Sequence, residues 1–269
     1  MSDATGRQRS EAPATAEVVR RGGLLAAWGT AVLQGLCSPD DAVDAIVGDD
    51  EPHRVVGLGD DPMSWSVALG AIRRRGASAL VLVTPVPGDL AGLPGPPAVN
   101  REVLALGAGV MSDGHETTGL LPQLTTFGPA DDVATSVVWS AMATSGPVGA
   151  GRRPTLSEAD RTLAQTLDSA LRRLAALDVA RWRPEVATLR DDLDGPSSER
   201  LPPGFPDRGV RLLARAQRMS AVLALGRSDP GGAVTAVEVQ QRQQTLDQLT
   251  RAVREAQAAA WNAGSEPGR

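Results

Sequence analysis

The strongest constraint on the fold is the spacing of apolar residues, which becomes purely helical after about residue 154. Thr155-Leu156-Ser157-Glu158 forms a capping box, in which side chain and backbone groups satisfy each other at the start of a helix. Five apolar positions then follow at 4-3-4-3 spacing, which places them on one helix face. These positions are Leu163, Leu167, Ala170, Leu174 and Leu177.

Three more segments of the second half have the same periodicity. A helix carrying Trp182, Val186, Leu189 and Leu193 is expected first, followed by helices over about 207–225 and 233–262. Short loops between consecutive helices favour antiparallel packing. The sequence therefore predicts an antiparallel four-helix domain over residues 152–262.

The first half mixes helical and strand-like patterns. A helix is predicted over about 17–36, and Ser38-Pro39-Asp40-Asp41 starts another that Gly48 ends. A strand at 54–58, a helix from Asp61 to Gly76 and an apolar run at 78–83 indicate a β–α–β unit with parallel strands and a right-handed crossover.

A short helix over about 99–110 and two strands near 118–127 and 133–142 complete the predicted N-terminal part. The fold class is thus α+β, with a small mixed α/β domain over 17–148 followed by the helical domain. Residues 1–16 and 263–269 are small, polar and aperiodic, and we expect them to be disordered tails.

Missing residue types exclude several kinds of chemistry. All 27 basic residues are arginine, so the chain lacks the lysine of a phosphate-binding loop, of Schiff-base catalysis and of protein kinases. A single cysteine, Cys37, excludes an intrachain disulfide and a cysteine-based zinc site. We predict no catalytic residue, no cofactor and no metal, and the chain is more consistent with a binding protein than with an enzyme.

The charge is negative overall and unevenly distributed. The net charge of −5 argues against a dedicated nucleic-acid partner. Residues 1–151 contain 9 arginines and 17 acids, about −8, whereas residues 152–269 contain 18 and 15, about +3. This asymmetry favours docking of the two halves against each other.

Arg20-Arg21 precede an apolar stretch that runs from Gly22 to Cys37, an order that superficially suggests an export signal. Leu36 before the cysteine is too large for lipoprotein processing, and the stretch is too short to span a bilayer. Its apolar residues also recur at helical spacing. We therefore expect a helix of a cytoplasmic protein with no membrane association.

The loop 84–97, TPVPGDLAGLPGPP, is one of two candidate functional segments. Loops of this length without secondary structure often bind partners or ligands, so Pro87, Gly88 and Asp89 are the candidate binding residues. A purely structural loop, in which Asp89 bonds the backbone of its own loop, is an equally good interpretation.

The second candidate is the polar cluster Asp113-Gly114-His115-Glu116. Asp113, His115 and Glu116 could ligate a divalent ion or act as an acid–base site. Adjacent side chains on one loop rarely converge on one ion, so a solvated turn is the simpler interpretation.

Two weaker patterns lie around residues 40–61. Eight acids between Asp40 and Asp61 accompany His53, but they lack the regular ligand spacing of a calcium loop. Gly57-Leu58-Gly59 matches only the beginning of a dinucleotide-binding fingerprint, because position 62 is proline and Val83-Thr84 occupy the place of the required acid.

Several segments together resemble an uncharacterised family of high-GC Gram-positive bacteria. They are LLAAWG, SPDDAVDAI, HRV, VLVTPVPGDLAGLPGPP, RWRPE and GGAVTAVE, which span most of residues 22–262. The resemblance implies that the first helix belongs to the mature fold. It implies no activity, so no catalytic residue is carried over.

The sequence favours a non-enzymatic cytoplasmic protein that acts through a protein partner or as a homo-oligomer. The absence of familiar catalytic residues and the regular leucine-faced helices motivate this hypothesis. One alternative is a small-molecule-binding protein or hydrolase with a site between the two halves, near Asp89 and residues 113–116. Another is weak nucleic-acid association through the basic helical half.

Overall fold

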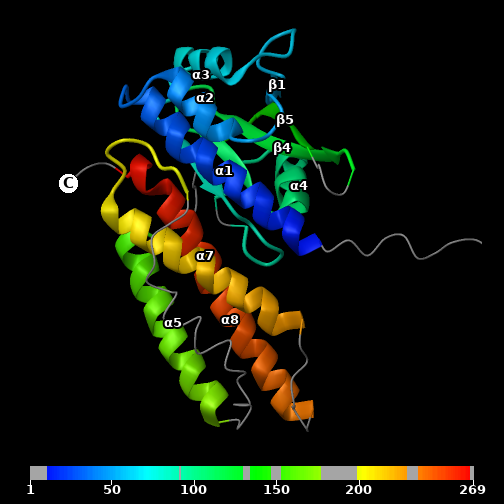
Figure 1. Ribbon diagram of the computed structural model, residues 1–269, viewed down its shortest axis with the longest axis vertical. Coiled ribbons are helices and arrows are strands. Elements are labelled where there is room, and N and C mark those ends of the chain that lie inside the picture. The colour runs from blue at the N-terminus through cyan, green and yellow to red at the C-terminus, as the bar shows by residue number, and fades with distance from the viewer. Residues whose placement is uncertain are drawn as a thin grey trace, which may run out of the picture.

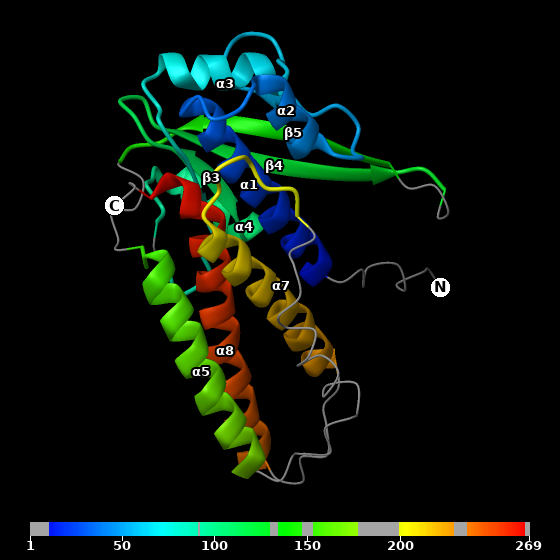
Figure 2. The ribbon, with the colours of Figure 1, turned by 60° about the vertical axis from the view of Figure 1, so that its left-hand side comes forward.

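The computed structural model describes residues 11–90, 92–129, 134–146, 153–176, 199–228 and 236–266. Within these residues it is mixed α and β, with seven α-helices and one five-stranded sheet. The sheet and its covering helices form one end of the molecule, and three long helices extend away from it (Figures 1 and 2).

The sheet has the order β1-β5-β4-β3-β2. Its strands are β1 (Arg54–Val56), β2 (Leu80–Val83), β3 (Gly109–Ser112), β4 (Thr118–Phe127) and β5 (Ala134–Ala143). Only the β1–β5 pair is parallel, and the other three pairs are antiparallel. The two strands predicted near 118–127 and 133–142 are confirmed as β4 and β5, paired over ten residues.

The predicted parallel β–α–β unit is wrong. β1 and β2 lie in one sheet, but at opposite edges, and the pairings between them make them run in opposite directions. The helix α3 (Trp65–Arg74) lies in the connection that joins these two edge strands. The meander of β3, β4 and β5 fills the centre, because short connections favour antiparallel neighbours.

The predicted helix over 99–110 is too long. α4 (Pro97–Leu106) ends where Gly107 adopts φ +79°, a left-handed conformation typical of a helix C-terminus. Residues 109–112 then form β3, a buried strand that the sequence analysis missed. Its four residues are all buried, so the run lacks the alternation that identifies a half-exposed strand.

The first helix, α1 (Glu11–Leu33), is the centre of the fold and begins six residues earlier than predicted. All residues from Arg21 to Val32 are buried, as expected for a helix surrounded by protein on every side. It packs on the sheet, on α2 (Pro39–Val47), on α3 and on the end of the chain (Figure 1). None of the described helices is long and apolar enough to cross a membrane.

Glycines on α1 allow close approach of its neighbours. A Cβ on Gly23 would lie 2.3 Å from the indole ring of Trp261, and one on Gly29 would lie 2.5 Å from the Leu80 side chain. Real Cβ atoms do not approach so closely, and overpacking a filled core typically costs about 1–3 kcal/mol. The apolar stretch that superficially suggests an export signal is therefore shaped for helix packing.

Several predicted helix boundaries are confirmed. The Ser38 hydroxyl accepts the amide proton of Asp41 at 3.1 Å, and Gly48 ends α2 with φ +57°. The predicted start of α3 at Asp61 is wrong, because Met63 bonds the backbone of Val55 and the helix begins at Trp65, but its buried face carries Trp65, Leu69 and Ile72 as predicted. At the start of α5 (Leu156–Ala176), the Thr155 amide donates to Glu158 at 2.9 Å, which completes the predicted capping box together with the reciprocal bond.

The helical half contains α5, α7 (Asp207–Ser228) and α8 (Ala236–Trp261), with α8 packed on both others. α5 begins beside Glu266 and α7 beside Ala263, so both run antiparallel to α8 and parallel to each other (Figure 2). The helix predicted from Trp182 to Leu193 lies outside the described residues. Val239, predicted on the inner face of the last helix, is 47% exposed.

The two halves share one hydrophobic core. Its main cluster includes Leu25 of α1 and Val137 of β5 together with Leu163, Leu213 and Val253 of the helical half. After α8, the 3-10 turn η1 (Asn262–Ser265) packs against α1 and β2. The end of the chain is thus part of the sheet layer.

The outer edges of β1 and β2 are hydrogen-bonded by other parts of the chain. At β2, Thr30 bonds both backbone groups of Leu80, and the Asn262 side-chain amide bonds both backbone groups of Leu82 at 2.8 and 2.9 Å. At β1, Val55 exchanges two backbone hydrogen bonds with Met63. Because exposed edges pair readily with other chains, this arrangement closes the sheet to strand addition at these positions.

Candidate functional site

The predicted binding loop is attached to the helical half. Val86 and Asp89 exchange two backbone hydrogen bonds, so Pro87 and Gly88 form the tip of a tight turn, with φ +86° at the glycine. The Asp89 carboxylate lies 2.5 Å from the Arg254 guanidinium of α8. Asp89 therefore fastens the loop to α8, a contact between the acidic and basic halves.

The polar cluster at 113–116 does not converge on one point. One Asp113 oxygen accepts the amide protons of Ser78 and Ala79 at 2.6 and 2.7 Å, and the other accepts the Ser78 hydroxyl proton at 2.6 Å. The exposed His115 packs beside Gly76, and Glu116 lies 3.7 Å from Arg75. All three therefore contact the segment 75–79 that leads from α3 into β2.

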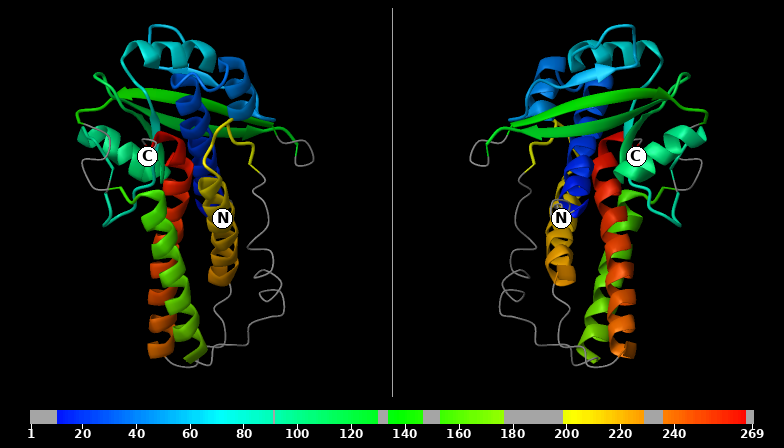
Figure 3. Two further views of the ribbon diagram at one scale, coloured as in Figure 1. Left: turned by 90° about the vertical axis from the view of Figure 1, so that its left-hand side faces the viewer. Right: turned by 90° about the vertical axis from the view of Figure 1, so that its right-hand side faces the viewer.

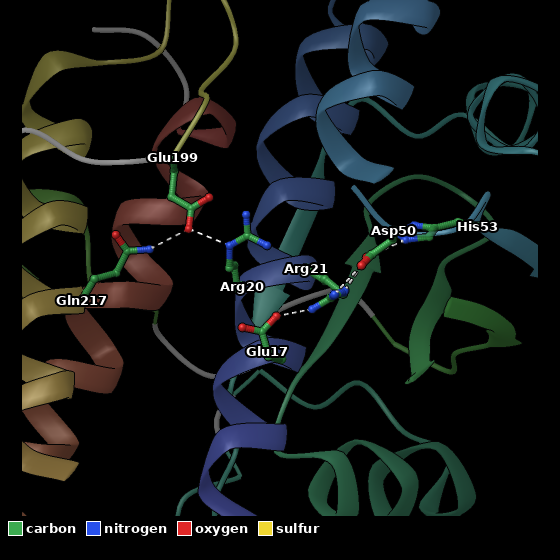
Figure 4. A network of polar contacts seen from close by, with 7 residues as sticks. All are labelled: Glu17, Arg20, Arg21, Asp50, His53, Glu199 and Gln217. Atoms are coloured by element: carbon green, nitrogen blue, oxygen red, sulfur yellow. Dashed lines mark hydrogen bonds and ion pairs between the residues drawn. The ribbon is translucent and has the colours of Figure 1, made fainter. Parts of the chain in front are cut away.

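A different polar group is the most unusual feature of the interior. Arg21 of α1, 6% exposed, donates two hydrogen bonds of 2.8 Å to Asp50 and also pairs with Glu17. Asp50 in turn lies 3.2 Å from Nε2 of His53, and Trp139 of β5 donates its indole proton to Nδ1 of His53 at 3.3 Å. Figure 4 shows the part of this chain of contacts that runs from Glu17 and Arg21 of α1 through Asp50 to His53.

The network controls which of its groups carry charge. Burial alone would raise the pKa of Asp50, but the hydrogen bonds from Arg21 and His53 outweigh it and lower that pKa. Burial lowers the pKa of His53, although Asp50 opposes this shift. The result is a buried ion pair beside a neutral imidazole.

This arrangement is unsuited to acid–base catalysis. The His53 side chain has no exposed surface, and both of its ring nitrogens are already bonded within the fold. A catalytic base needs a nitrogen within reach of the substrate proton. Among the described residues no group of three or more His, Cys, Asp or Glu side chains is placed to hold a metal ion.

The sequence analysis noted His53 and its acidic neighbours but missed Arg21 and Trp139 as their partners. A signal was present. Arg21 is a charge directly adjoining a long apolar helical stretch, and buried charges are almost always paired. What the sequence could not indicate is that the partner would be Asp50, 29 residues further on.

Beyond these internal contacts, part of the sheet has no helix of the described residues packed on it. Val99 and Val103 of α4 form a small hydrophobic cluster with Val83, Met111 and Leu121, and Leu93, Leu106 and Met142 pack against it. Further along β4 and β5 the same face is exposed or half-buried, and Figure 3 shows the β4–β5 hairpin extending beyond α4. We call this region the open sheet face. It comprises Arg54, Val56, Gln123, Thr125, Phe127, Ser136, Val138 and Ser140.

The open sheet face differs in composition from the rest of the surface. Arg54 is the only charged residue among the eight, and Phe127 is 49% exposed. Depletion of charge and exposed aromatic surface are characteristic of the central part of protein–protein interfaces.

Comparisons with known proteins identify relatives along the whole fold. Residues 23–154 match the model of the Rv1486c-like protein, N-terminal domain, and residues 157–258 match that of the C-terminal domain. The chain is 28% identical to "Uncharacterized protein Rv1486c" of Mycobacterium tuberculosis strain H37Rv, over 88% of this chain and 94% of the relative.

A second relative, "Uncharacterized protein MT1533" of M. tuberculosis strain CDC 1551, has the same identity and coverage. No solved structure matches the chain. The predicted resemblance to an uncharacterised family of high-GC bacteria is confirmed. The chain belongs to the Rv1486c-like protein family.

Proposed function

We propose that this protein is a non-enzymatic cytoplasmic protein that acts by self-association, with the open sheet face as its contact surface. The observation that carries the proposal is that this face is nearly uncharged and partly apolar, and that α4 leaves it uncovered. Sheet faces that are exposed in this way pack well on other sheets.

The state of the polar residues supports a role without catalysis. Asp89 bonds Arg254, Asp113 bonds the backbone of 78–79, and both nitrogens of His53 are engaged. Asp89, Asp113 and His53 thus each join parts of the chain.

A second copy of this chain is the occupant we favour. In a two-fold contact the same patch meets itself, so a patch with many charges of one sign would repel its copy. The open sheet face carries one charge, and Glu51, whose backbone bonds Thr135 beside it, offers that arginine an opposite charge on the other copy. Where the outer edges of β1 and β2 are already hydrogen-bonded, stacking of faces is favoured over strand addition.

The cytoplasmic assignment and the four-helix arrangement belong to the same proposal. The stretch from Gly22 to Val32 is buried at the centre of the fold, which supports its role as a core helix instead of a cleaved signal. α5 and α7 run parallel to each other and antiparallel to α8, as the first and third helices of an up-down-up-down bundle do.

Analytical ultracentrifugation of the full chain tests the proposal. We expect a reversible dimer, and Val138→Asp should raise its dissociation constant at least tenfold, because it buries an unpaired carboxylate. The matched control is Val67→Asp on α3, at a valine that is 54% exposed and outside the open sheet face. A wild-type chain that stays monomeric at all concentrations, or a dimer that both variants weaken equally, contradicts the proposal.

A further inference from the structure

The proton on the buried His53 ring has a defined position. The indole nitrogen of Trp139 can only donate a hydrogen bond, so the Nδ1 atom of His53, 3.3 Å away, must be the acceptor. The neutral ring therefore carries its proton on Nε2, where it is donated to Asp50 at 3.2 Å. Tautomer and orientation of the imidazole follow from its two neighbours.

The charges that face this ring come from two elements. Asp50 approaches from the segment between α2 and β1, and Arg21 of α1 lies behind it with Glu17 as a further partner. One Asp50 oxygen, Oδ2, accepts from both Arg21 and His53. From β5 and α3 the contacts are aromatic, with Trp139 against His53 and Trp65 edge-on to Trp139 at 5.3 Å.

A second proton on this ring is incompatible with the arrangement. It would place an N–H on Nδ1 directly against the N–H of Trp139, so two donors would face each other with no acceptor between them. The imidazolium would also be a second positive charge close to Arg21. Both cations would share Oδ2 of Asp50, which already accepts a hydrogen bond from Arg21. A side chain with no exposed surface has no water to compensate either effect.

We propose that His53 is an acid-sensitive latch, in which uptake of one proton at Nδ1 breaks the bond to Trp139 and releases residues 49–53 from α1 and β5. At neutral pH the latch is closed and the three elements are held together. In acid the segment separates and the ring becomes hydrated. The proposal does not depend on self-association, because its readouts lie within one chain.

The direction of the pH dependence follows from proton binding. Burial lowers the pKa of His53 in the folded chain, so between the ordinary histidine pKa of about 6.5 and this lower value the unfolded chain binds more protons. The stability that the latch provides is present above about pH 6.5 and is lost as the pH falls toward the lowered pKa. One proton limits the effect to a tenfold change in the unfolding equilibrium constant per pH unit.

The chain has two histidines, which makes the test direct. Urea unfolding between pH 7.5 and 5.5 should show the unfolding constant of the wild type rising up to tenfold per unit over the acidic part of this range. His53→Gln, which keeps a donor for Asp50 but cannot titrate, should remove most of this rise. His115→Gln, at the exposed histidine, should leave the pH profile of the wild type unchanged.

Nitrogen NMR of histidine-labelled wild-type protein gives a second readout that needs no variant. For the His53 ring we expect the Nε2–H tautomer, protonation below the ordinary histidine pKa of about 6.5, and faster amide exchange of residues 49–53 as it occurs. An Nδ1–H tautomer for the buried ring, or pH profiles that coincide for wild type and His53→Gln, overturns the latch.

Discussion

The two clusters of acidic residues and histidine in this protein are similar in composition, but one is buried and joins distant segments, whereas the other is mostly exposed. Asp50 and His53 are joined inside the fold to Arg21 and Trp139, which come from two other elements. Asp113, His115 and Glu116 lie side by side on the β3–β4 connection, and His115 and Glu116 are exposed. The buried cluster is a junction of three elements, whereas the exposed cluster supports the fold mainly through one residue, Asp113.

The largest difference should appear when a charge is left alone in the interior. Arg21→Met removes the guanidinium but keeps much of its aliphatic length, so Asp50 loses its two 2.8 Å bonds. Breaking a buried ion pair from one side typically costs about 3–5 kcal/mol of unfolding free energy. Urea unfolding of the wild type and of Arg21→Met at pH 7.5 measures this difference in unfolding free energy.

The double variant Arg21→Met/Asp50→Asn sharpens this experiment. Since the second substitution removes the unpaired charge, it should recover part of the lost stability. A double variant that loses the sum of both single effects would mean that the two residues act independently, against the network in Figure 4.

A smaller effect is expected from Asp113, which accepts hydrogen bonds from the backbone of residues 78–79. Asp113→Ala leaves the amides of Ser78 and Ala79 without their acceptor at the entry to β2. Hydrogen bonds to a charged group contribute about 1.5–3 kcal/mol each, less where water can replace the carboxylate, so a loss of about 2 kcal/mol is expected. Thermal unfolding should detect it, and Asp113→Asn, which keeps one oxygen, should lose less. If neither variant changes the unfolding temperature, Asp113 does not stabilise the fold.

The smallest effect belongs to Glu116. Its ion pair with Arg75 spans 3.7 Å, and its side chain is 75% exposed. Exposed pairs of this kind contribute at most about 1 kcal/mol and often nothing measurable. Glu116→Gln should therefore change the unfolding free energy by less than about 0.5 kcal/mol in the same urea experiment. If Glu116→Gln lowers the unfolding free energy as much as Asp113→Ala does, the proposed difference between these two residues is wrong.

Local features of the fold could be predicted from the sequence because their partners are local. The Ser38 cap, the capping box at Thr155–Glu158 and the buried face of α3 each depend on residues within about eight positions. Spacing also identified β4, β5 and most of the helices. These are the levels at which short-range chemistry determines structure.

The order of the sheet could not be predicted, because it depends on distant contacts. β1 and β2 read as neighbours, yet three strands separate them, and the edge of β2 is completed by Thr30 and Asn262. β3 was missed because it is short and buried throughout. Register and neighbour choice depend on which faces the helices cover, information that single segments do not contain.

The candidate functional residues could be predicted from the sequence only in part. Asp113 and Asp89 were identified by residue type, and the structure places them in contact with residues 78–79 and with Arg254. The open sheet face could not be found at all, because Val138 and Ser140 look like ordinary strand residues until the extent of α4 is known. Whether a sheet face is exposed depends on where the neighbouring helices end, which the strand sequence does not contain.

The amide of Asn262 on Leu82 has a consequence for synthesis of the chain on the ribosome. The two residues are 180 positions apart, so the outer row of β2 emerges long before the side chain that completes it. Before Trp261 is synthesised, the packing position beside Gly23 that its indole ring occupies in the complete fold is unfilled. A nascent chain that stops before Trp261 carries both an unsealed strand and a hollow beside its central helix. Such exposed strand edges promote aggregation of incomplete chains, so the N-terminal half of this protein depends on the last turn of α8 and on η1 to complete its packing.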